Sequence, residues 1–254
     1  FYARRMVATA PGSANMRTGS SAKGMGMGEF TSVSTLEGDA QFDAYVAKPE
    51  GEPTAAIIVI QEIFGVNAHI RDVTDGYAGQ GYLSIGPALF DRFERGVELG
   101  YTDEDIVVGR EYKAQGNENL DNVMADVAAA HANVAGAGQR NNKVGITGYC
   151  WGGVVVWAAA CRLDFDAAAC YYGGGIIDLK DEMPKCPTIL HFGKQDASIL
   201  MEDVNAISAA HPVLAVFVYD AGHGFNCDRR PSYNAESSAI ARERTLAFLA
   251  ENLG

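Results

Sequence analysis

The chain has 254 residues, of which 48% are hydrophobic and 20% charged, proportions that are ordinary for a globular protein. No uninterrupted apolar run approaches the ~18 residues that a membrane span needs, so the sequence argues against a membrane-embedded protein. The formal net charge of −12 repels polyanions and argues against a nucleic-acid-binding protein.

The first 28 residues differ in composition from everything after them. They hold four basic residues and no acidic one, with much Gly, Ser and Met. An Arg-bearing, acid-poor segment is typical of a transit peptide, but its glycines disfavour a continuous amphipathic helix, and a tag or upstream translated stretch fits equally. We therefore predict a leader, tag or flexible extension over residues 1–28 and one domain over residues 29–254.

Hydrophobic periodicity then changes repeatedly along the chain, as alternating strands and helices require. Residues 30–48 predict a hairpin with its turn at 37–39. Continuous apolar, β-branched runs predict strands buried on both faces of a parallel sheet, at residues 56–60, 82–87, 144–148, 167–172, 188–192 and 214–219. Amphipathic patterns predict helices over residues 120–134, 154–162, 201–210 and 235–253.

A hairpin followed by β-α-β-α units implies an α/β fold, with a mostly parallel central sheet covered by helices on both faces. Residues 91–115 are the least regular stretch, rich in charge with scattered glycines. We expect this stretch to form a cap or helical excursion over one end of the sheet and not a second domain.

The sharpest local signal is the run from Val144 to Gly153, in which a strand enters a helix through G-x-C-x-G-G. This is a nucleophile-elbow pattern with cysteine in place of serine. Gly148 and Gly152 leave room for the tight turn, and the start of the following helix favours the nucleophilic thiolate of Cys150. The alternative is that Cys150 is only a small buried hydrophobic residue. That role suits the cysteines inside apolar runs better, namely Cys161, Cys170 and Cys186.

An acid and then a histidine should follow the elbow, each in a loop after a later strand. Asp196 follows the strand at 188–192, and His223 follows the strand at 214–219. Open α/β sheets bind ligands at the carboxyl ends of their strands, where all three residues would meet. The order predicts Cys150 as nucleophile, His223 as base and Asp196 as the residue that orients His223.

From about residue 30 to 253 the sequence resembles the dienelactone hydrolases (carboxymethylenebutenolidases), of the α/β-hydrolase superfamily. The shared stretches, in chain order, are QEIFG at 61–65, GYCWGG at 148–153, YYG at 171–173, GKQD at 193–196, AGHGF at 221–225 and ERT at 243–245. Several motifs in the family's order make a chance match improbable. The resemblance implies a triad of Cys150, Asp196 and His223.

The resemblance also assigns roles around the triad. Glu62 would hold the resting thiol and take its proton when substrate displaces it. The oxyanion hole would be the backbone N–H groups of Ile63 and Trp151, in keeping with the geometry of the elbow. For substrate binding, the resemblance points to Arg92, which would contact a substrate carboxylate. We further expect aromatic residues to line the pocket, namely Phe64, Trp151, Tyr172 and Phe225, although a core role suits them equally.

One position departs from the family. A second substrate-binding arginine commonly follows the catalytic histidine by four residues, and Cys227 stands there in this chain. Arg229 and Arg230 follow closely, and either could replace it. The departure leaves the specific substrate open.

These residues predict a carboxylic ester hydrolase that opens a small enol lactone such as dienelactone through an acyl-enzyme, without metal or organic cofactor. A broader carboxylesterase or thioesterase on the same triad is the first alternative, favoured if Arg92 does not face the pocket. A non-catalytic α/β-hydrolase relative that binds a small ligand or a protein, and a thiol redox sensor, are weaker ones.

Five cysteines with no CxxC pair predict reduced thiols and a cytoplasmic location. We expect a small-molecule ester or lactone as the partner, no nucleic acid or membrane, and a monomer or small homo-oligomer.

Overall fold

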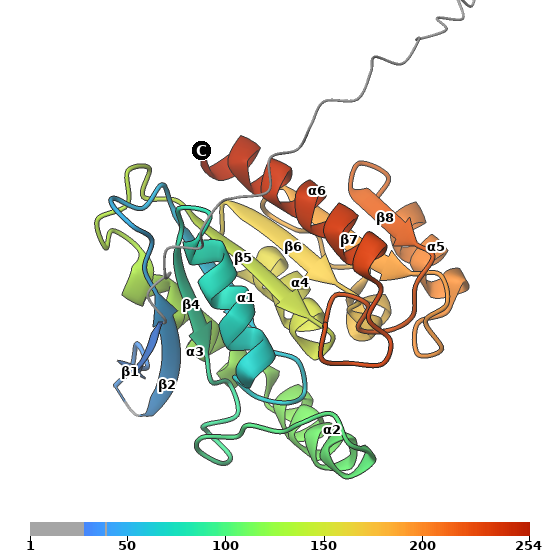
Figure 1. The fold of residues 1–254 in the computed structure, drawn as a ribbon, viewed down its shortest axis with the longest axis horizontal. Helices are drawn as coiled ribbons and strands as arrows, with labels where there is room; N and C mark the ends of the chain where they lie inside the picture. Colours follow the sequence, from blue (N-terminus) through green and yellow to red (C-terminus); the bar gives the residue numbers. More distant parts are fainter. Residues whose placement is uncertain (1–27, 39) are drawn as a thin grey trace, which may run out of the picture.

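The structure is a computed structural model that describes residues 28–38 and 40–254, so the predicted leader lies outside the described residues except for Gly28. Within this part, one eight-stranded sheet runs through the molecule, with helices on both faces (Figure 1). In chain order its strands are β1 (Glu29–Ser34), β2 (Gln41–Ala47), β3 (Ala56–Ile60), β4 (Leu83–Pro87), β5 (Val144–Tyr149), β6 (Ala167–Tyr171), β7 (Thr188–Gly193) and β8 (Ala215–Tyr219).

The sheet has the strand order β1-β2-β4-β3-β5-β6-β7-β8. β1 and β2 form the predicted antiparallel hairpin, and β2 is also antiparallel to β4. All pairings from β4 to β8 are parallel. The predicted mostly parallel sheet is confirmed, and each predicted strand is found to within one residue at either end.

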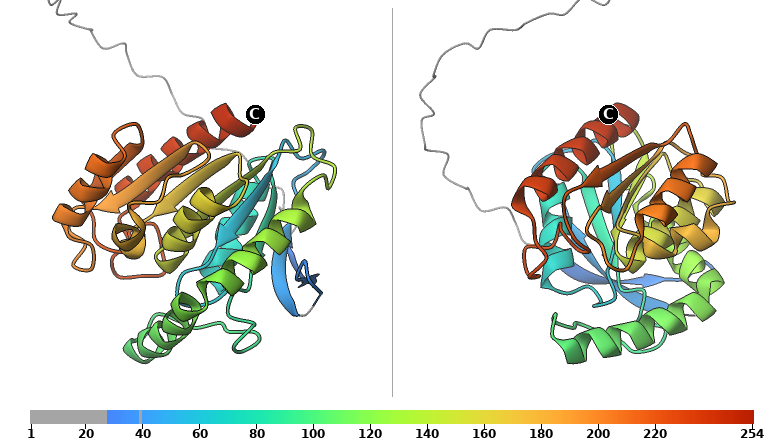
Figure 2. Two further views of the ribbon diagram at one scale, coloured as in Figure 1. Left: turned by 180° about the vertical axis from the view of Figure 1, so that it is seen from behind. Right: turned by 90° about the vertical axis from the view of Figure 1, so that its right-hand side faces the viewer.

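Two helices cover one face of the sheet and two cover the other. On the near face in Figure 1, α1 (Ala68–Ala78) packs on β2, β3 and β4, and α6 (Ala235–Leu253) packs on β5 and β6. On the far face, seen in the left view of Figure 2, α3 (Leu120–Val134) packs on β3 and β4 and α4 (Trp151–Arg162) on β3, β5 and β6. A short 3-10 helix (Gly174–Leu179) contacts α4 and α5 (Met201–Ala210).

The stretch expected to be irregular holds a long helix, α2 (Asp103–Glu118), which projects beyond the sheet (Figure 1). It begins with a capping box, in which the Thr102 side chain accepts from the backbone N–H of Asp105 while the Asp105 carboxylate accepts from the backbone N–H of Thr102. The expected helical excursion is therefore present and more regular than predicted. Helix α1, capped by Asn67, was not predicted.

The register of the parallel strands brings their carboxyl ends together. Ile60 of β3 lies opposite Gly148 of β5, and Gly193 of β7 lies opposite Tyr219 of β8. The loops that follow these strands are therefore neighbours at one edge of the sheet. None of the described helices is long and apolar enough to cross a membrane.

Candidate active site

Cys150 sits at the sharp turn between β5 and α4. Its backbone has φ 57° and ψ −118°, a conformation that L-residues rarely adopt. The turn depends on its glycines, because a Cβ on Gly148 would lie 2.5 Å from the Gly152 carbonyl oxygen and one on Gly152 would lie 2.4 Å from that of Gln61. Such strain persists only where the surrounding structure enforces it, which is typical of a functional position.

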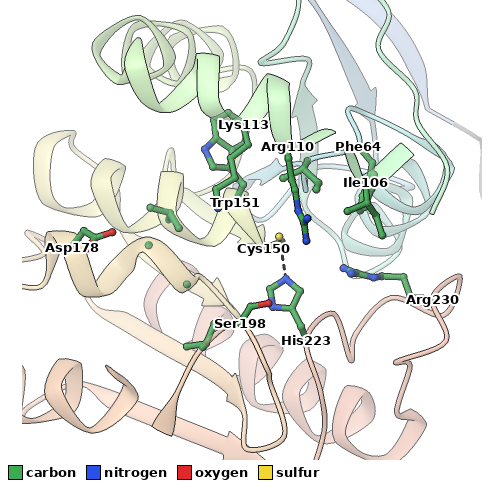
Figure 3. Close-up of a pocket in the computed structure, with 15 residues that line it drawn as sticks. Phe64, Ile106, Arg110, Lys113, Cys150, Trp151, Asp178, Ser198, His223 and Arg230 are labelled. Carbon is green, nitrogen blue, oxygen red and sulfur yellow. Dashed lines mark hydrogen bonds between the residues drawn. The ribbon is translucent and has the colours of Figure 1, made fainter. Parts of the chain in front are cut away.

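His223 and Asp196 complete a hydrogen-bonded line with this thiol. Nε2 of His223 lies 3.1 Å from Sγ of Cys150 (Figure 3). Nδ1 of His223 lies 2.7 Å from Oδ2 of Asp196. The other carboxylate oxygen of Asp196 accepts from the backbone N–H of Ser198 at 2.8 Å, which fixes the carboxylate. The structure thus brings the three residues of the predicted triad together.

The protonation of His223 follows from these partners. Burial alone would lower its pKa, but the negative charge of a Cys150 thiolate and the hydrogen bond to Asp196 outweigh burial and raise the pKa to about 10. A protonated imidazole beside the sulfur stabilises a thiolate. The geometry therefore supports an ion pair of the kind that activates cysteine nucleophiles.

Glu62 is fully buried next to this line. Its Oε1 accepts from Nη1 of Arg230 at 3.1 Å, and its Oε2 accepts from the hydroxyl of Tyr101 at 3.2 Å. The thiol of Cys150 is hydrogen-bonded to His223, and no hydrogen bond joins it to Glu62. The structure therefore has the thiol bonded to His223, while Glu62 is held by Arg230 and Tyr101.

A cavity of about 410 Å³ opens in front of Cys150 and His223. Ile63, Phe64 and Trp151 line it, as expected. Its charged lining is mostly cationic and includes three residues the sequence did not predict as a group, Arg110, Lys113 and Arg230, with one acid, Asp178. Figure 3 shows Arg110 and Arg230 reaching toward Cys150 from α2 and from the loop after β8.

Helix α2 packs closely on both predicted oxyanion-hole residues. A Cβ on Gly109 would lie 2.5 Å from the carbonyl oxygen of Ile63, and one on Gly116 would lie 2.6 Å from the indole of Trp151. The same indole donates to Oδ1 of Asn117 at 2.9 Å. The two glycines therefore allow α2 to approach the site closely enough to place Arg110 and Lys113 in the cavity lining.

Three predicted substrate-binding residues do not line this cavity. Arg92 forms a bidentate ion pair with Asp126, with Nε–Oδ2 and Nη2–Oδ1 distances of 2.7 and 2.8 Å. Tyr172 and Phe225 are fully buried, and the Tyr172 ring packs edge-on against His223 and Phe225 with centroids 5.2 and 5.4 Å away. Tyr172 therefore packs against His223, and Phe225 packs against Tyr172.

The structure also distinguishes the two candidate replacements for the family's second arginine. Arg230 enters the site and binds Glu62, and its guanidinium lies 5.7 Å from the ring centroid of Phe64. Arg229 points to the surface and pairs with Asp72. The Cys227 side chain is buried and its Sγ hydrogen-bonds the Tyr101 hydroxyl at 3.2 Å. Of the two arginines, Arg230 therefore lies in the site, and its replacement of the family's second arginine stays a prediction.

The chain is similar to proteins of one family throughout its described domain. The sequence profile of the dienelactone hydrolase family matches residues 42–253. A carboxymethylenebutenolidase from Pseudomonas putida is 34% identical over 230 residues, which cover 87% of this chain and 96% of the relative. A Synechocystis protein provisionally named carboxymethylenebutenolidase is 38% identical over 234 residues, covering 84% and 93%.

A solved structure is similar in three dimensions as well. The crystal structure of a Klebsiella pneumoniae protein provisionally assigned as a dienelactone hydrolase superposes with a TM-score of 0.75 at 29% identity. The alignment covers 88% of this chain and 99% of the other. The sheet, its helices and these similarities agree with the predicted α/β-hydrolase fold.

Proposed function

The chain belongs to the dienelactone hydrolase family of enzymes that act on ester and lactone bonds, and we propose that it opens a small enol lactone with Cys150 as nucleophile. The observation that carries this proposal is the continuous line Asp196–His223–Cys150, with 2.7 and 3.1 Å between the bonded atoms. A binding protein would have no need of these three groups in this order.

In the proposed reaction, the thiolate of Cys150 attacks the ring carbonyl and forms a carbon–sulfur bond. Backbone N–H groups of Trp151 and Ile63 donate to the oxyanion that develops. The ring C–O bond then breaks, and the leaving oxygen departs as an enolate, which is stable enough for a thiol to displace. Water attacks the thioester and gives up a proton to the enolate, the carbon–sulfur bond breaks, and the acid and the thiolate are released.

The role that the family resemblance implies for Glu62 belongs to a resting state in which the thiol contacts Glu62, whereas in this structure the thiol is bonded to His223. We infer that Glu62 accepts the thiol proton when substrate displaces the thiol toward His223. The hydrogen bonds from Arg230 and Tyr101 support this inference, because they fix the carboxylate inside the protein beside the site.

A carboxylate on the substrate would bind to cationic side chains of the cavity, which do not include Arg92. Arg110 and Lys113 line the cavity, and neither forms an ion pair with any residue in the described ranges, whereas Arg92 is paired with Asp126. A planar carboxylate suits a guanidinium, which can bind it through two hydrogen bonds. We therefore assign recognition of a substrate carboxylate to Arg110 and Lys113 on α2, with Arg230 beside them.

The test compares hydrolysis of a dienelactone by the purified protein and by Cys150→Ser. The rate is measured as the loss of absorbance of the conjugated chromophore. Turnover that falls by roughly 10³-fold or more in the variant supports the reaction and the nucleophile. With the wild-type enzyme, a covalent adduct at Cys150 trapped by acid quenching supports the acyl-enzyme. Undiminished turnover in Cys150→Ser contradicts the assignment of the nucleophile.

The engagement of Arg92 with Asp126 favours one second candidate, a broader carboxylesterase or thioesterase on the same triad. The two functions differ in the ratio of kcat/KM for dienelactone to kcat/KM for p-nitrophenyl acetate. A ratio well above one supports the lactonase, and a ratio below one supports the esterase.

A further inference from the structure

Two more side chains with metal-ligating atoms, His69 and Cys227, lie beside Glu62. One ligand atom from each of the three lies within 4.8 Å of the others, and all three residues are buried. Together they offer one oxygen, one nitrogen and one sulfur. Mg²⁺ and Ca²⁺ prefer all-oxygen sites, whereas Zn²⁺ accepts this mixed set. We propose that Glu62, His69 and Cys227 form a reversible binding site for Zn²⁺.

A buried nitrogen of His69, unpaired among the described residues, also indicates a ligand at this cluster. Its exposed fraction is 3%, and its Nε2 is buried without a hydrogen-bond partner in the described part of the chain. A buried polar nitrogen normally has a partner, because leaving one unpaired costs free energy. The other ring nitrogen, Nδ1, lies 3.8 Å from a carboxylate oxygen of Asp228. Metal-bound histidines commonly direct their second nitrogen at such a carboxylate.

The hydroxyl of Tyr101 joins the other two ligands. It accepts from Sγ of Cys227 at 3.2 Å and donates to Oε2 of Glu62 at 3.2 Å. When Zn²⁺ binds, the Cys227 thiol releases its proton to solvent and a sulfur–zinc bond forms. A surface hollow of about 370 Å³ lined by His69 and Tyr101 gives the ion a route from solvent.

Arg230 sets the strength of the site. Its guanidinium binds Oε1 of Glu62, which leaves Oε2 for the metal, and its positive charge opposes a second cation. The affinity is therefore lower than that of a structural zinc site, and binding is reversible. Provided that Glu62 has the role proposed above, a bound Zn²⁺ withdraws it from the reaction and inhibits hydrolysis.

The experiment is a titration of the reduced protein with Co²⁺, which occupies Zn²⁺ sites and gives a thiolate-to-cobalt absorption band. We expect one Co²⁺ per chain, displacement by Zn²⁺, and no band in Cys227→Ser. His69→Ala should weaken binding by more than the roughly 10–100-fold that loss of an outer-shell partner causes. The matched control is Cys150→Ser, in which the band should persist, because Cys150 is not a ligand.

Folding of each variant is checked by near-ultraviolet circular dichroism, and a Cys227→Ala variant replaces Cys227→Ser if the latter is unfolded. No band with wild-type protein, a band that survives in Cys227→Ser, or a band lost in Cys150→Ser would overturn the proposal. Each of these measurements records metal binding in the absence of substrate. The metal site can therefore be disproved without disproving the proposed hydrolysis, and the reverse also holds.

Discussion

Arg230 binds Glu62 inside the protein, with 3.1 Å between Nη1 and Oε1, although the two residues are 168 positions apart in the sequence. The Glu62 side chain is fully buried and that of Arg230 is 16% exposed. A buried carboxylate needs such a partner, because removal of one member of a buried pair leaves an uncompensated charge. Arg230 therefore supports the fold and the site at once.

Arg230→Met should lower the free energy of unfolding by about 3 kcal/mol, since Glu62 loses its ionic partner. The double variant Arg230→Met/Glu62→Gln should recover much of that loss. Urea unfolding measures both. The matched control is Arg229→Met, whose pair with Asp72 is exposed and worth less than about 1 kcal/mol. Equal losses in the two arginine variants would contradict the buried pair.

His223 should titrate far above the usual histidine range. Its pKa is raised to about 10 in the folded protein, so its protonated form stabilises the native state fully below about pH 6.5, and this contribution is lost as the pH rises through 10. NMR titration of the ring should show an imidazolium at pH 8. In Cys150→Ser the pKa should fall, because the thiolate charge is gone. A wild-type midpoint near 6.5 would disprove the ion pair.

Gly109→Ala tests how α2 supports the oxyanion hole. Alanine in a helix gains about 1 kcal/mol over glycine, while overpacking costs about 1–3 kcal/mol, so stability should change little or fall modestly. The kcat should fall more clearly, because the new Cβ displaces the backbone of Ile63. Steady-state kinetics and thermal unfolding separate the two effects. Ala114→Gly on the exposed face is the control, and it should lose about 1 kcal/mol without a change in kcat.

Arg110→Gln and Lys113→Gln should each raise KM for an anionic lactone by roughly 3- to 10-fold, which corresponds to about 1 kcal/mol of lost binding. The KM for uncharged p-nitrophenyl acetate should not change, because that substrate has no carboxylate to bind. An equal effect on both substrates would indicate a change in the shape of the cavity and would argue against charge recognition.

Arg92→Gln should lower stability and leave KM for the anionic lactone unchanged, in contrast to Arg110→Gln and Lys113→Gln. Asp126, with a side chain only 1% exposed, loses its bidentate partner, and the free energy of unfolding should fall by about 3 kcal/mol. KM for the anionic lactone should stay near the wild-type value. If KM rises as much as in Arg110→Gln, Arg92 reaches the substrate after all and the assignment to α2 is wrong.

Much of the fold could be predicted because the central strands are continuous apolar runs, such as Ala56–Ile60, that no other element explains. Helix α2 could be expected only as a cap or helical excursion without defined bounds, because its fully buried residues are the glycines Gly109 and Gly116, which add nothing to hydrophobic periodicity. Its charged N-terminal turn and capping box were the available signal. Helix α1 was missed for a related reason, since polar His69 and Thr74 lie on its buried face.

Part of the candidate site could likewise be predicted from the sequence, and part could not. Cys150, Asp196 and His223 each follow a strand directly, so chain order predicted that they would meet. The partners of Glu62 come from distant loops, and no local pattern shows that Arg230 and not Arg229 turns inward. Arg92 and Asp126 are 34 positions apart, and side-chain pairing at that separation leaves no periodic trace in the sequence.

The placement of the triad directly after β5 and in the loops after β7 and β8 also bears on how the protein folds. The three groups meet only after four neighbouring parallel strands, β5 to β8, have found their register. Parallel pairing of this kind forms late, because each strand must close a long loop before it gains contacts. The return of catalysis during refolding therefore marks the pairing of β5 to β8, later than collapse or helix formation.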